Sequence, residues 1–326
     1  MHEALRAVYS TLIVALSGMG VPLVRGESIS VVFLGNSHTY TNDLPGLVQS
    51  LAAAGGDTVK ARSSTPGGCT FSYPTNEHLH NEVSIGLLEA GGWDYVVLQE
   101  QSQFPCIPYL RDNYMYPGAA ALDSIAHAHT PCCITILYMT WGHNHQAPWV
   151  ETFAGYSSPE FSGYDEMQDS VAAAYVRLAD SLGTPVAPAG VAWQNAYHGG
   201  IPLDVLFSPD QYHPALAGSY LAACVFYAAL LQKSPVGLPF TAELDDSLAA
   251  VLQAVADSTV MPYLAEWNID PAMPHAAFEF TWSVPPLPES ASGTDMCSLG
   301  LIVPTGVSGG SADPVPRVER LQTSYP

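Results

Sequence analysis

The chain has 326 residues, of which 48% are apolar and only 12% charged, so it can bury a large core and is not an intrinsically disordered protein. Asp and Glu outnumber Lys and Arg by 30 to 9, which gives a formal charge of −21. A surface of this sign repels phosphate backbones and anionic lipid. The composition therefore argues against a nucleic-acid partner and favours a neutral substrate such as a sugar or a simple ester.

The two ends of the chain differ from its middle. Arg6 and the apolar stretch 8–24, with Val24 and Gly26 flanking a candidate cleavage point, are typical of an export signal, although a disordered or strand-adjacent N-terminus is the alternative. The stretch is too short and too interrupted by Gly and Pro to span a membrane. We predict a secreted protein, extracellular or periplasmic and without membrane insertion. Its predicted parts are a signal peptide (1–26), one domain (27–284) and a flexible linker or tail (285–326), which is rich in Ser, Gly, Pro and Thr.

Between these ends, short apolar runs alternate with segments of helical spacing. In chain order the pattern predicts a strand at 29–34, a helix at 44–54, a strand at 58–61, a helix at 77–90, a strand at 95–98, a helix at 117–129, a strand at 133–139, a helix at 164–182, a strand at 186–189, and helices at 214–231 and 245–267. Such alternation is typical of a parallel sheet that is covered on both faces. We therefore predict an α/β fold, namely a doubly wound, mostly parallel five-stranded sheet with helices on both faces.

In doubly wound sheets, ligands bind beyond the carboxyl ends of the strands, so the loops there are the first place to search for a site. The loop after the first strand reads Gly35-Asn36-Ser37-His38. A Ser between a strand end and a helix start exposes its hydroxyl near backbone N–H groups that can bind an oxyanion. Ser37 is thus a candidate nucleophile, and the alternative is an ordinary helix cap.

A second candidate motif lies far along the chain, at Asp210-Gln211-Tyr212-His213-Pro214. Asp and His three residues apart in a turn can place the carboxylate on one imidazole nitrogen and leave the other free to act as a base. The alternative is an Asp that caps the following helix and a His at the surface.

Together the two motifs resemble those of the SGNH (GDSL-like) hydrolase superfamily, over roughly residues 29–231. The segment 210–223 is similar to the exported bacterial branch of that family. The resemblance implies a flavodoxin-like fold with Ser37 as nucleophile, His213 as general base and Asp210 as the group that orients the imidazole. The common first motif of the family has Asp where Asn36 stands here, but this change removes no member of the triad.

The resemblance also implies an oxyanion hole. Its donors would be the N–H of Ser37, a Gly of the loop 66–69, and a side chain that follows the third strand. Gly68 fits the second donor, although an ordinary tight turn is the alternative. The usual Gly-x-Asn motif is replaced by the stretch 98–103, which is similar to a segment of carbohydrate acetylesterases. We predict Gln99 as the third donor, with Gln101 or Gln103 as alternatives.

Three further sets of residues are open to interpretation. His143-x-His145 has metal-ligand spacing, but no third ligand is evident, so we favour a solvated loop and expect no metal or organic cofactor. Trp141, Trp149 and Trp193 fit either a sugar-stacking platform or the core. Finally, we hypothesise that Cys69 and Cys106 form a disulfide beside the oxyanion loop, whereas Cys133 and Cys224 lie in apolar runs and are expected to be buried thiols.

These observations predict a serine ester hydrolase without a cofactor that removes acetyl groups from carbohydrate. One alternative is a lipid or thioester hydrolase with the same triad, which a long apolar groove would favour. The other is a secreted glycan-binding module in which the triad is no longer catalytic.

Overall fold

A computed structural model describes residues 26–269 of the chain. The predicted signal peptide, apart from its last residue, and the predicted tail lie outside these residues, as does the end of the predicted domain. Within the described part, no helix is both long enough and apolar enough to cross a membrane.

The centre of the molecule is a five-stranded sheet in which every strand pairs in parallel with its neighbours. Its order is β2-β1-β3-β4-β7, the arrangement of flavodoxin-like folds. The strands are β1 (Ser28–Leu34), β2 (Thr58–Ser64), β3 (Tyr95–Leu98), β4 (Ile134–Tyr138) and β7 (Val186–Ala187). All five follow the predicted positions within a few residues, so the doubly wound α/β fold is confirmed.

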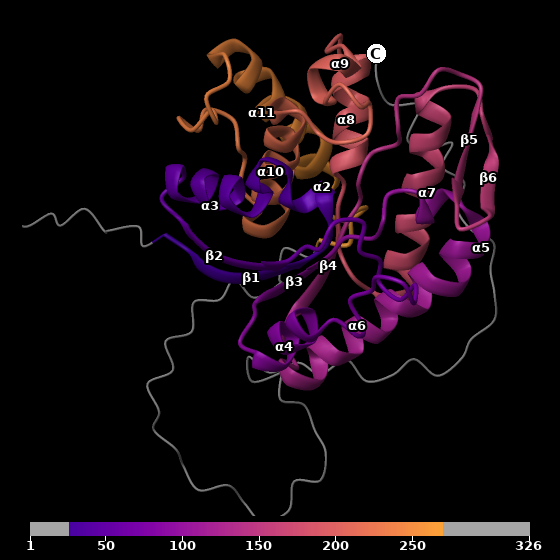
Figure 1. Ribbon diagram of the computed structural model, residues 1–326. Helices are drawn as coiled ribbons and strands as arrows, with labels where there is room; N and C mark the ends of the chain where they lie inside the picture. Colours follow the sequence, from indigo (N-terminus) through magenta and orange to yellow (C-terminus); the bar gives the residue numbers. More distant parts are fainter. Residues whose placement is uncertain (1–25, 270–326) are drawn as a thin grey trace, which may run out of the picture.

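Helices cover both faces of this sheet, with α3, α10 and α11 on one side and α4 and α6 on the other (Figure 1). The helices are α2 (Ser37–Tyr40), α3 (Leu44–Ala54), α4 (Glu82–Ala90), α5 (Pro108–Leu110), α6 (Tyr116–His129), α7 (Tyr164–Leu182), α8 (Ala189–His198), α9 (Leu203–Leu206), α10 (Leu216–Leu231) and α11 (Asp246–Val260). Short helical turns are η1 (Thr41–Asp43), η2 (Phe104–Cys106), η3 (Arg111–Met115) and η4 (Met261–Tyr263).

The core forms where α10 lies on the sheet. Nearly every residue of α10 is buried, which is expected of a helix that is apolar on all sides. Its Phe226 ring makes edge contacts with Phe33 of β1, at 5.4 Å between centroids, and with Tyr138 of β4, at 5.0 Å. Because α10 directly follows the loop 207–215, this packing fixes that loop relative to the ends of the strands.

Several features differ from the predicted elements. The helix predicted over 245–267 ends at Val260, where the short helical turn η4 begins. An antiparallel hairpin, β5 (Trp149–Phe153) and β6 (Tyr156–Phe161), lies at the rim of the molecule beside α7 (Figure 1). Helix α4 begins at residue 82 rather than 77, because the Asn81 side chain caps it by accepting from the N–H groups of the second and third helical residues. Helix α8 was not predicted, because its sequence is short and rich in small residues.

Candidate active site

Ser37 is the first residue of α2 and follows β1 after a two-residue connection. The connection must be tight, because a side chain at Gly35 would place its Cβ 2.4 Å from Thr39 Oγ1 and 2.6 Å from Gln99 Oε1. Ser37 is 7% exposed. No residue in the described range accepts a hydrogen bond from its backbone N–H, so this N–H is available to a ligand.

Gln99, which directly follows β3, holds this connection in place. Its Oε1 accepts from the Asn36 N–H and from Thr39 Oγ1, both at 2.8 Å. The Asn36 N–H can only donate, so this contact fixes which end of the Gln99 amide is the oxygen. The Nε2 group then donates to Asn36 Oδ1 at 2.9 Å and to the carbonyl of Glu100. Both amide hydrogens are engaged, so this arrangement leaves Gln99 no N–H for an oxyanion and gives it a positioning role.

The same contacts explain why Asn stands at position 36. Its Oδ1 accepts from Gln99 and from the His38 N–H, and its Nδ2 donates to the Cys69 carbonyl at 2.9 Å. A carboxylate has no N–H with which to make the last of these bonds. The amide therefore links the nucleophile connection to the loop after β2.

That loop is the predicted oxyanion loop. The Cys69 N–H donates to the Pro66 carbonyl at 3.1 Å, and Gly68 at the turn has φ +64°, a conformation that favours glycine. Gly68 is exposed, and its N–H has no acceptor among the described residues. The ring of Tyr40, in the last position of α2, lies close to Gly67. The loop thus borders the Ser37 region, and the structure leaves the Gly68 N–H unused.

The hypothesis of a disulfide between Cys69 and Cys106 is wrong, because both are free thiols. Each sulfur instead contacts a nearby carbonyl, that of Thr70 at 3.7 Å and that of Gln103 at 3.1 Å. Burial, with a contribution from the charge of Glu100, raises the pKa of Cys69 to about 12. Cys133 and Cys224 are also free and buried, as predicted.

Asp210 and His213 form the predicted pair. Asp210 Oδ2 lies 2.7 Å from His213 Nδ1, and Asp210 Oδ1 accepts from the backbone N–H groups of Tyr212 (3.0 Å) and His213 (2.8 Å). Partial burial on its own would raise the pKa of Asp210, but these hydrogen bonds lower it below its ordinary value. His213 Nε2 makes no hydrogen bond to any described residue, so it is free to bind a proton.

The fold brings the two motifs together, although they are more than 170 residues apart. The His213 ring lies 5.6 Å, centroid to centroid, from the ring of His38, the residue after Ser37. On the other side, Asn42 Nδ2 donates to the Pro214 carbonyl at 3.2 Å. Among the described residues, Ser37 Oγ has no hydrogen bond to His213 in this state, and such bonds often tighten only when substrate binds.

His38 itself has a packing role. It is buried, and its ring contacts those of Trp141, Tyr212 and His213 at 5.1–5.6 Å. Burial, followed by the charges of neighbouring His side chains, lowers its pKa well below the ordinary value. A neutral His38 therefore fills the space between the two motifs without adding a positive charge beside His213.

The two alternative oxyanion donors are engaged elsewhere. Gln101 Nε2 donates to Gln103 Oε1 at 3.0 Å and to the Tyr212 hydroxyl at 3.3 Å. Gln103 Nε2 donates to Glu151 Oε2 at 2.6 Å. The side chains of the stretch after β3 are therefore hydrogen-bonded to one another and to neighbouring residues. Neither Gln101 nor Gln103 provides a side-chain donor that faces Ser37.

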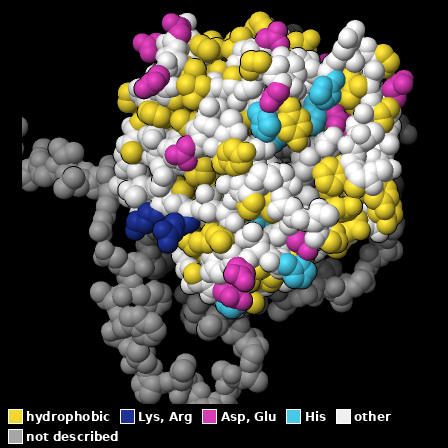
Figure 2. All heavy atoms as spheres, in the orientation of Figure 1, with side chains coloured by type: hydrophobic (Ala, Val, Ile, Leu, Met, Phe, Trp, Pro, Cys, Tyr) yellow, Lys and Arg dark blue, Asp and Glu magenta, His cyan; other side chains and the backbone are white. Residues whose placement is uncertain are grey.

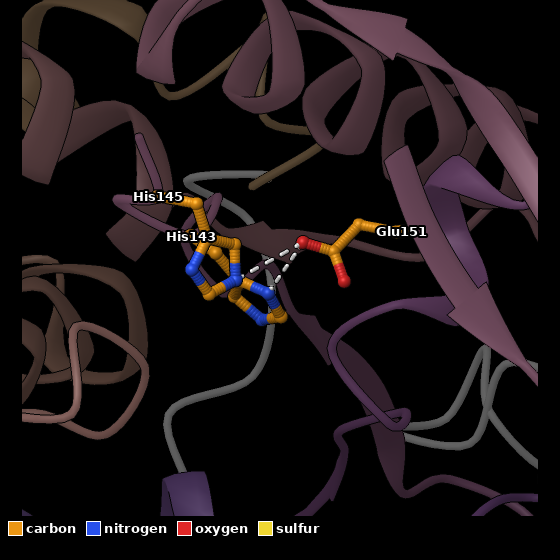
Figure 3. A group of neighbouring side chains, drawn as sticks. All are labelled: His143, His145 and Glu151. Atoms are coloured by element: carbon orange, nitrogen blue, oxygen red, sulfur yellow. Dashed lines mark hydrogen bonds and ion pairs between the residues drawn. The ribbon is translucent and has the colours of Figure 1, made fainter. Parts of the chain in front are cut away.

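The His-x-His motif has a third partner that sequence reasoning missed. Glu151 of β5 lies beside both imidazoles, with its Oε1 2.9 Å from His143 Nδ1 and 3.5 Å from His145 Nε2 (Figure 3). The signal for this residue was weak, because the hairpin that carries it was not predicted. The expectation of a simple solvated loop is wrong for His143, which is fully buried.

The tryptophans also separate into two groups. Trp141 and Trp193 are fully buried and stacked at 3.9 Å, with 7° between their planes, so they belong to the core. Trp149 is only partly buried. An exposed aromatic side chain of α2 is that of Tyr40, three residues after Ser37, at 52% exposure.

Comparison with known proteins gives similarities of structure alone. No family model matches the chain, and neither does any curated protein sequence. Among solved structures, a DUF4886 family protein from Bacteroides uniformis shares 20% identity at a TM-score of 0.56, over 73% of this chain and 95% of that one. This chain therefore has the fold of that protein.

Other solved structures with weaker similarity are esterases. An acetyl esterase mutant with acetate ion shares 14% identity, and a carbohydrate esterase family 3 protein from Talaromyces cellulolyticus shares 15%; each has a TM-score of 0.42 and covers 63% of this chain and 97% of the other.

Proposed function

We propose that this protein is a serine ester hydrolase that removes acetyl groups from neutral carbohydrate. The observation that carries the proposal is the convergence of Ser37, an Asp-paired His213 and two unused backbone N–H groups at one edge of the sheet. Ser37 is nearly buried, whereas the His213 side chain is 31% exposed. A substrate can therefore approach from the side of the imidazole.

The proposed mechanism is acyl transfer in two steps. Ser37 Oγ attacks the ester carbonyl while His213 Nε2 accepts the hydroxyl proton. His213 then gives this proton to the departing alcohol, which leaves an acetyl-serine. Water attacks the acetyl-serine with His213 again as base, and acetate and free Ser37 are released. Asp210 keeps the ring proton on Nδ1 and stabilises the imidazolium that forms.

The oxyanion of each tetrahedral intermediate would rest on the backbone N–H groups of Ser37 and Gly68. Donors that are already held in place need no reorganisation as charge develops, and losing one such donor typically costs about 10²–10³-fold in kcat. Gln99 contributes indirectly, because its contacts with Asn36 and Thr39 hold the Ser37 N–H in position.

The proposed substrate class rests on the charge of the chain and on one exposed aromatic ring. On the face shown in Figure 2, acidic side chains are scattered, and the Lys and Arg side chains gather in one place. With a net charge of −21, the field disfavours anionic esters such as phospholipids. The exposed ring of Tyr40 beside the oxyanion loop offers an apolar face with a hydroxyl group, which suits a sugar ring.

Labelling with a serine-directed fluorophosphonate tests the nucleophile. Mass spectrometry should find the adduct on Ser37 in the native chain and none in Ser37→Ala. Ser181→Ala, which removes an exposed serine at the end of α7, should label like the native protein. An unlabelled native chain, or an adduct on another serine, contradicts the proposal.

Initial rates across acetyl, butyryl and octanoyl esters test the substrate class. We expect kcat/KM to fall as the acyl chain lengthens, and acetylated oligosaccharides to be better substrates than simple aryl acetates, because remote contacts can stabilise the transition state. A rate that rises toward octanoyl would instead support a lipid hydrolase with the same triad.

A further inference from the structure

Beside the proposed triad, three side chains from the loop after β4 and from β5 point toward one another. These are His143, His145 and Glu151, whose nearest nitrogen and oxygen atoms all lie within 4.8 Å of one another (Figure 3). Glu151 Oε1 is at the centre of the group, 2.9 Å from His143 Nδ1 and 3.5 Å from His145 Nε2. Zinc bonds of about 2.0–2.1 Å in a tetrahedral site place neighbouring ligand atoms about 3.3–3.4 Å apart. The two distances from Glu151 Oε1 to the imidazole nitrogens need to change by only a few tenths of an ångström.

The outer contacts of this group aim its ligand atoms inward. Gln103 Nε2 donates to Glu151 Oε2 at 2.6 Å, and Trp149 Nε1 donates to Oε1 at 3.1 Å on the atom that also faces the two imidazoles. The other ring nitrogen of His143, Nε2, lies 3.1 Å from Ser102 Oγ. Hydrogen bonds of this kind to the far side of a ligand are the usual support of a protein metal site.

We propose that His143, His145 and Glu151 form a binding site for a divalent cation of the zinc class. Two imidazoles and one carboxylate suit Zn²⁺, and three protein ligands leave one position for water. His143 and Glu151 are buried, whereas the His145 side chain is 40% exposed, so the ion can enter from the His145 side. The overall negative charge of the chain also raises the local concentration of cations.

The position of the site indicates what a bound ion would hold together. Asn144, between the two ligands, donates its backbone N–H to the Gln211 carbonyl at 3.2 Å. The His143 ring lies 4.4 Å from the ring of Tyr212. A cation here would therefore fix the β5 hairpin to the loop that carries Asp210 and His213. The site does not depend on the proposed hydrolase activity.

Isothermal titration of the full chain with Zn²⁺, after treatment with a chelator, tests the site directly. We expect one equivalent to bind, and His145→Ala to weaken binding by about 100-fold or more, because losing even an outer partner costs 10–100-fold. His145→Ala leaves the buried contacts of His143 intact. His198→Ala, which removes another exposed histidine that is paired with a carboxylate, is the matched control and should bind like the native chain.

The visible absorption spectrum of the Co²⁺-loaded protein gives a second measurement. It reports on the ligands of the metal and not on the stability of the fold. The native chain should show the visible bands of low-coordinate Co²⁺, and Glu151→Gln should lose them while its far-ultraviolet circular dichroism stays native. Failure of the native chain to bind Zn²⁺, or equal binding by His145→Ala, would overturn the proposal.

Discussion

Two carboxylate–imidazole pairs lie on either side of Tyr212, and they differ in access rather than in local geometry. Asp210 and His213 are 2.7 Å apart, and Glu151 and His143 are 2.9 Å apart. The side chains of the first pair are 52% and 31% exposed, whereas those of the second are 4% and 0% exposed. The far nitrogen of His213 is unused, but that of His143 faces Ser102.

This difference separates a pair that a substrate can reach from one that it cannot. Ser102, His143 and Glu151 have the contacts of a serine triad, yet Ser102 is buried and its hydroxyl is bound to Tyr212. No substrate can reach the Ser102 hydroxyl unless the stretch after β3 moves out of its packing. A serine, a histidine and a carboxylate in mutual contact are therefore not enough to identify a nucleophile. Solvent access to the imidazole, and an imidazole nitrogen that has no other partner, are also needed.

The largest expected effect on kcat comes from substituting the histidine of each pair separately. His213→Gln should lower kcat by about 10⁴-fold or more with little change in stability, because it removes the proposed base. His143→Gln should do the reverse, with a lower melting temperature and a kcat within about tenfold of native. Steady-state kinetics and thermal unfolding of both variants provide the measurement. An equal loss of kcat in a folded His143→Gln protein contradicts the separation of roles.

A smaller loss is expected from Asp210→Asn, which leaves His213 in place. The amide cannot hold the ring proton on Nδ1 as a carboxylate does, and a change of this kind costs up to about 10⁴-fold in serine hydrolases. Because Asp210 is half exposed, water can replace part of its effect, and we expect a loss of about 10²–10³-fold. The kcat values of Asp210→Asn and His213→Gln, measured at one pH, check this order. A larger loss in Asp210→Asn than in His213→Gln contradicts it.

Sequence reasoning reached the first pair and missed the second for a physical reason. Asp210 and His213 are three residues apart in one turn, so spacing alone places them in contact. Glu151 meets His143 only through a hairpin whose strands do not show clear alternation in sequence. The five strands and most helices were predictable because apolar runs and glycine stops are local signals. The role of Gln99 was not, because it depends on the long-range contacts with Asn36 and Thr39 that use both ends of its amide.

A third carboxylate, that of Glu100, shows what happens without an imidazole partner. Burial raises its pKa to about 8, although its oxygens accept from the N–H groups of Phe71 and Gln101. Its folded pKa thus lies above the ordinary value of 4.5. The stability that it contributes is fully present below pH 4.5 and is lost as the pH rises through 8, with a slope of at most about 1.4 kcal/mol per pH unit.

Urea unfolding between pH 5 and 8.5 measures the pH-dependent contribution of Glu100 to the free energy of unfolding. The native chain should lose free energy of unfolding with increasing pH, and Glu100→Gln should show a flatter profile because an amide does not titrate. Comparing the two chains removes the contribution of the other acidic groups. Parallel profiles would mean that Glu100 is already ionised at pH 5 in the folded protein.

The smallest expected effect is that of Tyr212→Phe, at the boundary between the two pairs. The Tyr212 ring packs 4.4 Å from the ring of His143 and 4.7 Å from that of His213, and phenylalanine keeps both contacts. Only the hydroxyl is lost, which accepts from Ser102 and Gln101 on the buried side. A hydrogen bond of this type contributes about 0.5–1.5 kcal/mol, so we expect a loss of stability in this range. We expect kcat to change by less than about threefold, because the hydroxyl makes no bond to His213 or Asp210. A kcat that falls 100-fold in a stably folded Tyr212→Phe protein would mean that the buried pair acts on the exposed one through this hydroxyl, and that the two pairs work as a single unit.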